Sequence, residues 1–535
     1  MQDRQRIFGL AAFARLGGLF ALLIAAAVLV SGATAAPVLT ELVSVRSNGK
    51  QANDISGRFS APAISDDGLV VAFDSQATNL VGGDNNGVVD VFVHDRTSGR
   101  TMVVSVSSKG RLGNGTSSAP AVNADGRFVA FSSGASNLVP GDTNVSGDVF
   151  VYDRLAGDTT RVSVGPGGVQ GNATSFAPSI SGDGRFVAFT SDASNLVAGG
   201  TTGRHAFVHD RVTGATEIVD VTSDGTPATG FATPGAISGD GRFVAFGSFG
   251  SNLVPGDTNG AIDVFVHDRV TGTTERVSVR TDGGEGNDAS LRSSINGDGS
   301  IVTFSSEATN LVDGDTNEVR DIFVRHMATG VTERISVSSA GVQSDDNSDG
   351  FGIRGGTSFG PEVSTDGRHV AFDSQATNLI VDDTNTCSYQ GGQSFPIPGQ
   401  CPDIFVRDLL TDTTARVSVD SGGAQSNGAS TDPDINGDGS VTTFFSVASN
   451  LPRIRTRARC SRYRASARTS SCTSRRAAES KRSCGRRRER PPHVPGTGLG
   501  FSGGDRCLGR QLRGRGDRDP AARLLLERHP HFVGW

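Results

Sequence analysis

The chain of 535 residues is poor in tryptophan, tyrosine and methionine, with 1, 3 and 3 of these residues. Its central part, from Asp67 to Ser449, lacks apolar spacing of 3.6 residues over any useful length, which excludes a helical body. The chain also lacks an HExxH segment, a phosphate-binding loop and a supported Ser/His/Asp set. No catalytic motif therefore assigns an enzyme class, and an enzymatic activity is not the leading expectation.

Cysteine is absent from the regular repeats of the central part. Cys387 and Cys401 bracket one insertion, and the C-terminal tail holds the other four, Cys460, Cys472, Cys484 and Cys507. In an oxidising compartment the first pair is expected to form a disulfide, closing a loop of about 14 residues worth about 3 kcal/mol. A metal site is the alternative, although no histidine or further cysteine lies nearby in the sequence.

Two parts of the chain carry net charges of opposite sign. Residues 452–535 carry 22 Lys+Arg and 6 Asp+Glu, a net charge of +16, whereas residues 1–451 carry the remaining 28 and 50, a net charge of −22. An acidic body repels phosphate backbones, so nucleic-acid binding is not expected of the repeats. Cations and neutral or basic partners remain compatible with this charge.

The first 35 residues are typical of a secretory signal peptide. Arg4, Arg6 and Arg15 precede an apolar run over 16–30, and small residues follow, with cleavage expected after Ala35. An uncleaved anchor is the alternative, but the run is short for a bilayer span. Both interpretations place the body outside the cytoplasm, in the periplasm, on the cell surface or in the medium, with no transmembrane segment after signal removal.

One sequence repeat occurs seven times in the central part. Its Asp-Gly turns recur at steps of 58, 58, 57, 58, 68 and 72 residues, at Asp67, Asp125, Asp183, Asp240, Asp298, Asp366 and Asp438. A fixed period of this length indicates a repeat architecture, because one such unit cannot bury its own apolar face.

Each repeat contains four strand-like segments joined by polar turns. Examples are 177–181, 185–190 with its alternating large residues, 263–269 and 274–279. Tandem four-stranded units predict an all-β fold, a seven-bladed β-propeller of four-stranded antiparallel blades with the last blade incomplete. A solenoid is the alternative, but the repeats exceed the usual β-helix coil.

An N-terminal segment is expected to close this ring. Residues 42–49 match the fourth strand at 276–283, yet they precede the first repeat. Propellers commonly lend an N-terminal strand to the last blade as a clasp, which removes exposed sheet edges. The predicted organisation is thus 1–35 signal peptide, 36–451 propeller and 452–535 basic tail.

Two segments, 181–189 and 238–246, share the sequence Ser-Gly-Asp-Gly-Arg-Phe-Val-Ala-Phe, and the second is followed by Asp-Val-Phe-Val-His-Asp-Arg at 263–269. These motifs resemble the TolB-like family of WD-type β-propeller repeats. The resemblance covers about 410 residues and gains its specificity from seven copies. It implies a propeller that binds partners. No α/β domain precedes the propeller as in TolB itself, so the Tol-Pal role is not carried over.

Long polar loops between the second and third strands are the candidate metal sites. The pattern Asp-x-Asn-x-x-x-Asp gathers hard oxygen ligands suited to calcium, and it occurs as Asp84, Asn86 and Asp90; Asp142, Asn144 and Asp148; Asp257, Asn259 and Asp263; and Asp315, Asn317 and Asp321. A further copy has Asp383 and Asn385 with a displaced Asp403, and the third repeat, at Gly200-Thr201-Thr202, has lost the pattern. The alternative is an Asx turn in which these side chains bind their own backbone.

Three histidines recur at the end of the third strand, His94, His209 and His267. Equivalent positions on different blades do not converge, so we expect a surface role beside the Asp-Arg turn and no catalysis.

The repeat pattern stops at Asn450-Leu451, and we interpret residues 452–535 as a frameshifted, disordered tail. One codon reading of 453–456, shifted by a base, restores the Asp-Thr-Asn of earlier repeats. The alternative is a basic tail for nucleic acid or membrane. A G-x-S-x-G sequence at 500–504 has neither the strand nor the helix that a nucleophile elbow needs.

These observations lead to three functional hypotheses. The first is an extracytoplasmic, monomeric binding platform with a protein or glycan ligand on the face of the long loops. The second is a propeller-type hydrolase or lyase with its site at the channel mouth. The third is a truncated, frameshifted product without function.

Overall fold

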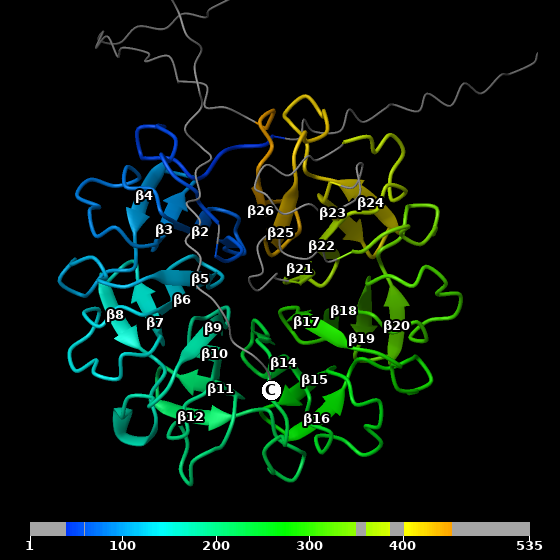
Figure 1. Ribbon diagram of the computed structural model, residues 1–535, viewed down its shortest axis with the longest axis horizontal. Coiled ribbons are helices and arrows are strands. Elements are labelled where there is room, and N and C mark those ends of the chain that lie inside the picture. Colours follow the sequence, from blue (N-terminus) through cyan, green and yellow to red (C-terminus); the bar gives the residue numbers. More distant parts are fainter. Residues whose placement is uncertain (1–38, 58, 349–359, 386–400, 452–535) are drawn as a thin grey trace, which may run out of the picture.

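The computed structural model describes residues 39–57, 59–348, 360–385 and 401–451. The predicted signal peptide, Cys387 and the basic tail lie outside these residues. Within them the chain is all-β, and its sheets are arranged around a common axis (Figure 1). A single short 3-10 turn, Pro166–Gly168, follows the second sheet.

Six four-stranded antiparallel sheets follow one another along the chain, and each has its strands in sequence order. We call them blades 1 to 6. Blade 1 comprises β1 (Ala63–Ile64), β2 (Val70–Ser75), β3 (Asp90–Asp95) and β4 (Arg100–Val103); blade 2 comprises β5 (Ser117–Val122), β6 (Phe128–Ser133), β7 (Asp148–Asp153) and β8 (Asp158–Arg161). Blade 3 comprises β9 (Ser175–Ile180), β10 (Phe186–Ser191), β11 (His205–Asp210) and β12 (Ala215–Ile218); blade 4 comprises β13 (Ala236–Ile237), β14 (Phe243–Ser248), β15 (Asp263–Asp268) and β16 (Thr273–Arg276). Blade 5 comprises β17 (Ser290–Ile295), β18 (Ile301–Ser306), β19 (Asp321–His326) and β20 (Val331–Arg334); blade 6 comprises β21 (Glu362–Val363), β22 (His369–Ser374), β23 (Asp403–Asp408) and β24 (Thr413–Arg416).

The seventh repeat forms only a two-stranded sheet, β25 (Ser430–Ile435) and β26 (Thr442–Ser446). The prediction of a seven-bladed propeller with its last blade incomplete is therefore wrong, because the described residues form six blades. The reason lies in the sequence, since the repeat pattern ends at Leu451, before its third and fourth strands.

The predicted N-terminal closing strand is also wrong. Residues 39–57 contain no strand; an isolated bridge joins Val45 to Gln51, and another joins Ser56 to Ser75. The same bridge follows the fourth strand elsewhere, for example between Val106 and Leu112. A closing strand needs a third strand to pair with, and the seventh repeat supplies none among the described residues. Thr40 Oγ1 nevertheless donates a hydrogen bond to Val419 O in the sixth repeat, at 2.6 Å.

Each blade has a phenylalanine pair at its centre. The second and third strands place one Phe each at directly opposed positions, such as Phe131 and Phe150 in blade 2, with ring centroids 5.9 Å apart. The same stacked pair recurs in all six blades with centroids 5.7–6.0 Å apart. Second strands are buried on both faces, as the run Val70–Ser75 illustrates. A sheet with two apolar faces needs a neighbour on each side, which favours a ring.

The innermost strands contact one another in succession around the ring, and β25 contacts β1. A belt of backbone hydrogen bonds joins the Asp-Gly turns at one end of these strands, and we call it the turn belt. It runs from Asp66 N to Ala124 O (3.1 Å), Ala124 N to Gly182 O (3.2 Å), Gly182 N to Gly239 O (2.8 Å), Asp240 N to Gly297 O (3.0 Å), Gly297 N to Thr365 O (3.0 Å), Asp366 N to Gly437 O (3.0 Å) and Gly437 N to Asp66 O (3.1 Å). The ring is thus closed by the turn of the seventh repeat, although its sheet is incomplete.

Glycine recurs in the turn belt because the turns approach closely. A Cβ at Gly297 would lie 2.5 Å from Thr365 Cγ2 and 2.9 Å from Thr365 O. We expect Gly297→Ala to lower the free energy of unfolding by about 1–3 kcal/mol through this overlap. Gly134→Ala is the matched control, since a Cβ there meets nothing within 4 Å. Chemical denaturation measures both variants, and equal stabilities would show that the belt does not constrain the ring.

Candidate functional site

The polar loops predicted to bind calcium lie between the second and third strands of each blade. In blade 1, Asn86 Nδ2 donates to Asp90 Oδ2 (2.7 Å) and to Gly113 O (3.0 Å). Asn259 and Asn317 make the equivalent bonds to Asp263 (3.2 Å) and Asp321 (3.0 Å). The side-chain oxygens of Asn86 and Asn259 also accept bonds from the loop backbone two residues later, from Val88 N at 3.3 Å and from Ala261 N at 2.8 Å. These asparagines therefore hold the loop in shape, as the Asx-turn alternative predicts.

An arginine of the fourth strand lies against both aspartates in four of the blades. Two distances describe each contact, the first from arginine Nη1 to the loop aspartate and the second from Nη1 to the third-strand aspartate. They are 3.6 and 3.3 Å for Arg161 with Asp142 and Asp148, and 3.7 and 3.1 Å for Arg276 with Asp257 and Asp263. They are 2.9 and 3.2 Å for Arg334 with Asp315 and Asp321, and 3.2 and 3.4 Å for Arg416 with Asp383 and Asp403. We call these the Asp–Arg clusters. Their side chains are almost fully buried, so the guanidinium supplies the positive charge that two close carboxylates need.

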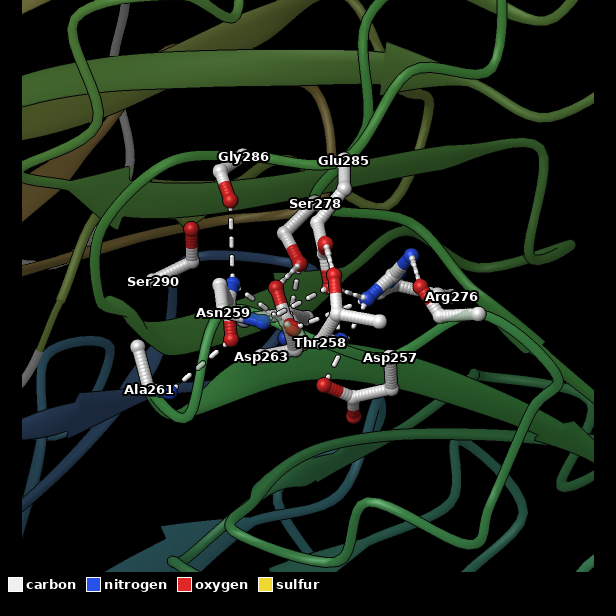
Figure 2. Close-up of polar contacts among 12 residues, drawn as sticks. Asp257, Thr258, Asn259, Ala261, Asp263, Arg276, Ser278, Glu285, Gly286 and Ser290 are labelled. Atoms are coloured by element: carbon white, nitrogen blue, oxygen red, sulfur yellow. Dashed lines mark hydrogen bonds and ion pairs between the residues drawn. The ribbon is translucent and has the colours of Figure 1, made fainter.

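Blade 4 shows the cluster with a third carboxylate (Figure 2). Oxygens of Asp257, Asp263 and Glu285 lie within 4.8 Å of one another, a grouping that suits a metal ion. Arg276 Nη1, however, lies 2.6 Å from Glu285 Oε1 and 3.1 Å from Asp263 Oδ2. Burial alone would raise the pKa of Glu285, but hydrogen bonds from Thr258 and Arg276 lower it to about 2. The chain's own cation thus already lies among these carboxylates, where it offsets one of their negative charges and competes with the metal predicted for blades 2, 4 and 5.

Blade 1 keeps the aspartates but lacks the arginine. Val103 stands opposite Phe92, at the position where Arg161 stands opposite Phe150 in blade 2. Burial, and then repulsion from Asp90, raise the pKa of Asp84 to about 6. Asp84, Asn86 and Asp90 therefore form the one predicted ligand set among the described residues that has no internal cation, and their oxygens suit calcium.

Blade 3 replaces the whole cluster. Ile218 takes the arginine position, and His205 takes the position of the third-strand aspartate. His205 Nδ1 lies 2.8 Å from Asp220 Oδ2, and both side chains are buried. The loss of ligands in this repeat is thus compensated by a His–Asp pair.

The three recurring histidines are buried, so the expectation of a surface role is wrong. His94, His209 and His267 each lie 2.9 Å, through Nδ1, from a fourth-strand threonine hydroxyl. That hydroxyl donates to a carbonyl of the preceding repeat, as Thr216 Oγ1 does to Val164 O at 2.5 Å. The histidines consequently join blades and do not converge.

Cys401 is buried and disulfide-bonded. Its predicted partner, Cys387, lies outside the described residues, so this pairing stays a prediction.

A ring of variable residues was missed in the sequence. One changing residue lies directly after the last serine of each second strand, and an alanine or glycine follows it. The changing residues are Gln76, Gly134, Asp192, Phe249, Glu307, Gln375 and Val447. The flanking serine is bonded within each repeat, as Ser133 Oγ is to Ser117 Oγ at 2.8 Å. The changing residue is exposed or half-buried in every copy. We call these seven residues the variable ring; they lie at the long-loop ends of the second strands. The sequence does contain a signal for this ring, because a serine and a small residue flank one changing position in every repeat.

Two carboxyl groups, those of Glu362 on β21 and Asp434 on β25, lie on neighbouring innermost strands of the sixth and seventh repeats. Asp434 Oδ2 accepts a hydrogen bond from Ile64 N (2.7 Å), and Glu362 Oε2 accepts one from Ser294 Oγ (2.7 Å). Burial raises the pKa of Glu362 to about 8, with a further contribution from the charge of Asp434. Burial raises the pKa of Asp434 to about 7, and Asp66 adds to the rise.

Comparisons with known proteins give distant structural similarities only. No family model and no curated protein matches the chain. Among solved structures, it is similar to TolB from Acinetobacter baumannii (13% identity, 65% of this chain and 63% of that one, TM-score 0.36). It is also similar to an oligogalacturonate lyase from Vibrio parahaemolyticus (12%, 77% and 93%, 0.43) and to the β-propeller domain of the trilobed protease from Pyrococcus furiosus (11%, 75% and 92%, 0.40). The chain spans less than two thirds of the length of the Acinetobacter baumannii TolB. The sheet topology itself defines the class, an all-β propeller with four-stranded antiparallel blades.

We expect calcium to raise the melting temperature of the wild-type protein through blade 1, because an ion that binds only the folded state stabilises it. Val103→Arg should abolish this shift and raise the melting temperature without calcium, since it installs the cation of the other blades. Thermal denaturation with and without millimolar calcium measures both effects. An unchanged shift in the variant would contradict the assignment to blade 1.

We expect stability to fall as pH rises from about 4.5 to about 8. In this window the native state retains protons on Glu362 and Asp434 that the unfolded chain has lost, so rising pH favours unfolding. Glu362→Gln should flatten the profile and stabilise the protein at pH 8. Parallel profiles for variant and wild type would show that these groups do not control it.

Proposed function

We propose that this protein is an extracytoplasmic binding platform whose ligand binds the long-loop face of the propeller. The single observation that carries the proposal is the variable ring. Seven equivalent positions share the same backbone frame, yet their side chains are amide, acidic, aromatic, aliphatic or absent.

The frame around the ring supports this proposal. In each repeat a backbone bond ties the variable residue to a residue upstream of the first strand, as Asp192 N does to Thr174 O at 2.9 Å. The flanking Ala193 is fully buried, whereas Asp192 is exposed. A rigid scaffold with exposed, changing side chains at its loop ends is the arrangement that repeat proteins use for recognition.

The extracytoplasmic location rests on the signal-like residues 1–35 and on the disulfide bond of Cys401. No helix among the described residues is long and apolar enough to cross a membrane. The partner class is a protein or a glycan.

Site-specific photo-cross-linking tests the face. We expect a photoreactive residue at Phe249, on the variable ring, to cross-link envelope or extracellular components. The same residue at Val270, which is 73% exposed on a turn at the opposite ends of the strands, should not. Equal cross-linking from both positions, or none from Phe249, would contradict the proposal.

The second candidate is a hydrolase or lyase with its site near the ring axis, and the pair Glu362 and Asp434 favours it. Two carboxyl groups whose pKa values are raised toward neutrality suit general acid–base work. For this candidate, Glu362→Gln should abolish turnover while the protein remains folded. The frameshifted product without function stays a third hypothesis, since the tail lies outside the described residues.

A further inference from the structure

The long-loop face carries an aromatic cluster where blade 3 meets blade 4. We define it as Phe176, Arg204, Phe231 and Phe249. Phe231 and Phe249 are 61% and 52% exposed, although both are large apolar side chains. Their equivalents in the other repeats are mostly small or polar, for example Thr116 and Gly134 in blade 2. The fold therefore does not require phenylalanine at either position.

Backbone and side-chain bonds fix the members of the cluster relative to one another. Phe249 N donates to Phe231 O at 3.2 Å, and Ala232 N, next in the chain, donates to Arg204 O at 3.1 Å. The Arg204 guanidinium lies over the ring of Phe176, with its central carbon 5.0 Å from the centroid. Two rings of blade 4 and a stacked arginine of blade 3 are thus held side by side.

An acidic partner neutralises the arginine. Arg204 Nε and Nη2 donate to the two oxygens of Asp192, at 2.8 and 3.2 Å. Both side chains are about 40% exposed, so this fork stays accessible to a ligand. The cluster consequently offers aromatic faces and directional hydrogen bonds without a net charge.

The loop of blade 3 leaves one aromatic ring uncovered. Where other blades have Asp-x-Asn, this loop reads Gly199-Gly200-Thr201-Thr202-Gly203. A Cβ at Gly203 would lie 3.7 Å from Phe231 Cε1, so the glycine lies against the ring without adding a side chain. Two polar threonines, Thr201 and Thr202, directly precede this glycine in the loop.

We propose that the aromatic cluster binds an uncharged carbohydrate chain. Sugar rings present C–H groups that stack on aromatic faces, and their neighbouring hydroxyls match an arginine–carboxylate fork, which both donates and accepts. A charge-neutral fork gives no gain to a strongly charged ligand. Phenylalanine and arginine are also common in protein interfaces, but aspartate is depleted from them, so Asp192 in the fork favours a carbohydrate over a protein. This inference rests on the proposed function and names the ligand class of the same face.

Affinity electrophoresis of the full chain tests the inference. The probes are five soluble neutral polysaccharides in the gel: hydroxyethylcellulose, laminarin, galactomannan, xylan and glycol chitin. We expect at least one to reduce the mobility of the wild-type protein twofold or more. The double variant Phe231→Ala, Phe249→Ala should migrate as in a gel without polysaccharide.

The matched control is Leu155→Ala with Val212→Ala, which removes residues 79% and 75% exposed on the opposite face. It should be retarded like the wild type. Circular dichroism checks that both double variants are folded, and Phe231→Leu, Phe249→Leu replaces the alanine variant if that one is not.

Absence of retardation with all five probes, or equal retardation of the aromatic variant, would overturn the carbohydrate inference. Cross-linking of a protein from Phe249 together with no retardation would do so as well, while leaving the binding-platform proposal standing. Failure of the proposed function is seen separately, as absence of cross-linking from the variable ring.

Discussion

Mutual burial of successive sheets is the constraint on which the structure depends. The second and third strands bury both of their faces, and each blade brings one stacked phenylalanine pair to its centre. No sheet of this kind is stable with one face in water, so every blade needs two neighbours. The turn belt expresses the same constraint in hydrogen bonds, since it passes through all seven repeats and returns to Asp66. The two-stranded seventh sheet is sufficient for closure because the belt and the innermost strand lie in its first half.

The closed ring leaves different freedom to different positions. Inside the blades, a loop aspartate, a third-strand aspartate and a fourth-strand arginine satisfy one another, and the sequence repeats them four times. Where the arginine is lost, the partners change: blade 3 uses His205 with Asp220, and blade 1 keeps two carboxylates beside Val103. At the long-loop ends of the second strands, no such partner is required. There the side chain varies from Gly134 to Phe249 on an unchanged frame, and recognition is compatible with the fold.

Much of the fold could be predicted from the sequence, because the repeats report strand number, turn positions and buried faces seven times over. The six complete blades follow from this pattern. The number of blades was predicted wrongly because the sequence gives the period but not whether half a repeat can close the ring. The closing strand failed because residues 42–49 match 276–283, and the structure ends the fourth strand β16 at Arg276 and continues with a segment that forms only the bridge between Val279 and Glu285.

The candidate site was less predictable. The Asp-x-Asn loops were found, but their charge balance depends on Arg276 and its equivalents, which lie 13 residues after the third-strand aspartate and meet it only through strand pairing. The carboxyl groups of Glu362 and Asp434 belong to different repeats and do not stand out in the sequence. The aromatic cluster likewise joins residues from two blades, 55 to 73 positions apart for Phe176 with Phe231 and Phe249.

Native-state hydrogen exchange at the turn belt tests the central claim most directly. A closed ring predicts that the amide of Gly437, which donates to Asp66 O at the seam where the seventh repeat meets the first, exchanges as slowly as those of Gly182 and Gly297, within the continuous part of the belt. Exchange at the seam that is faster by orders of magnitude, with the other belt amides protected, would show that the ring is open and would contradict this account.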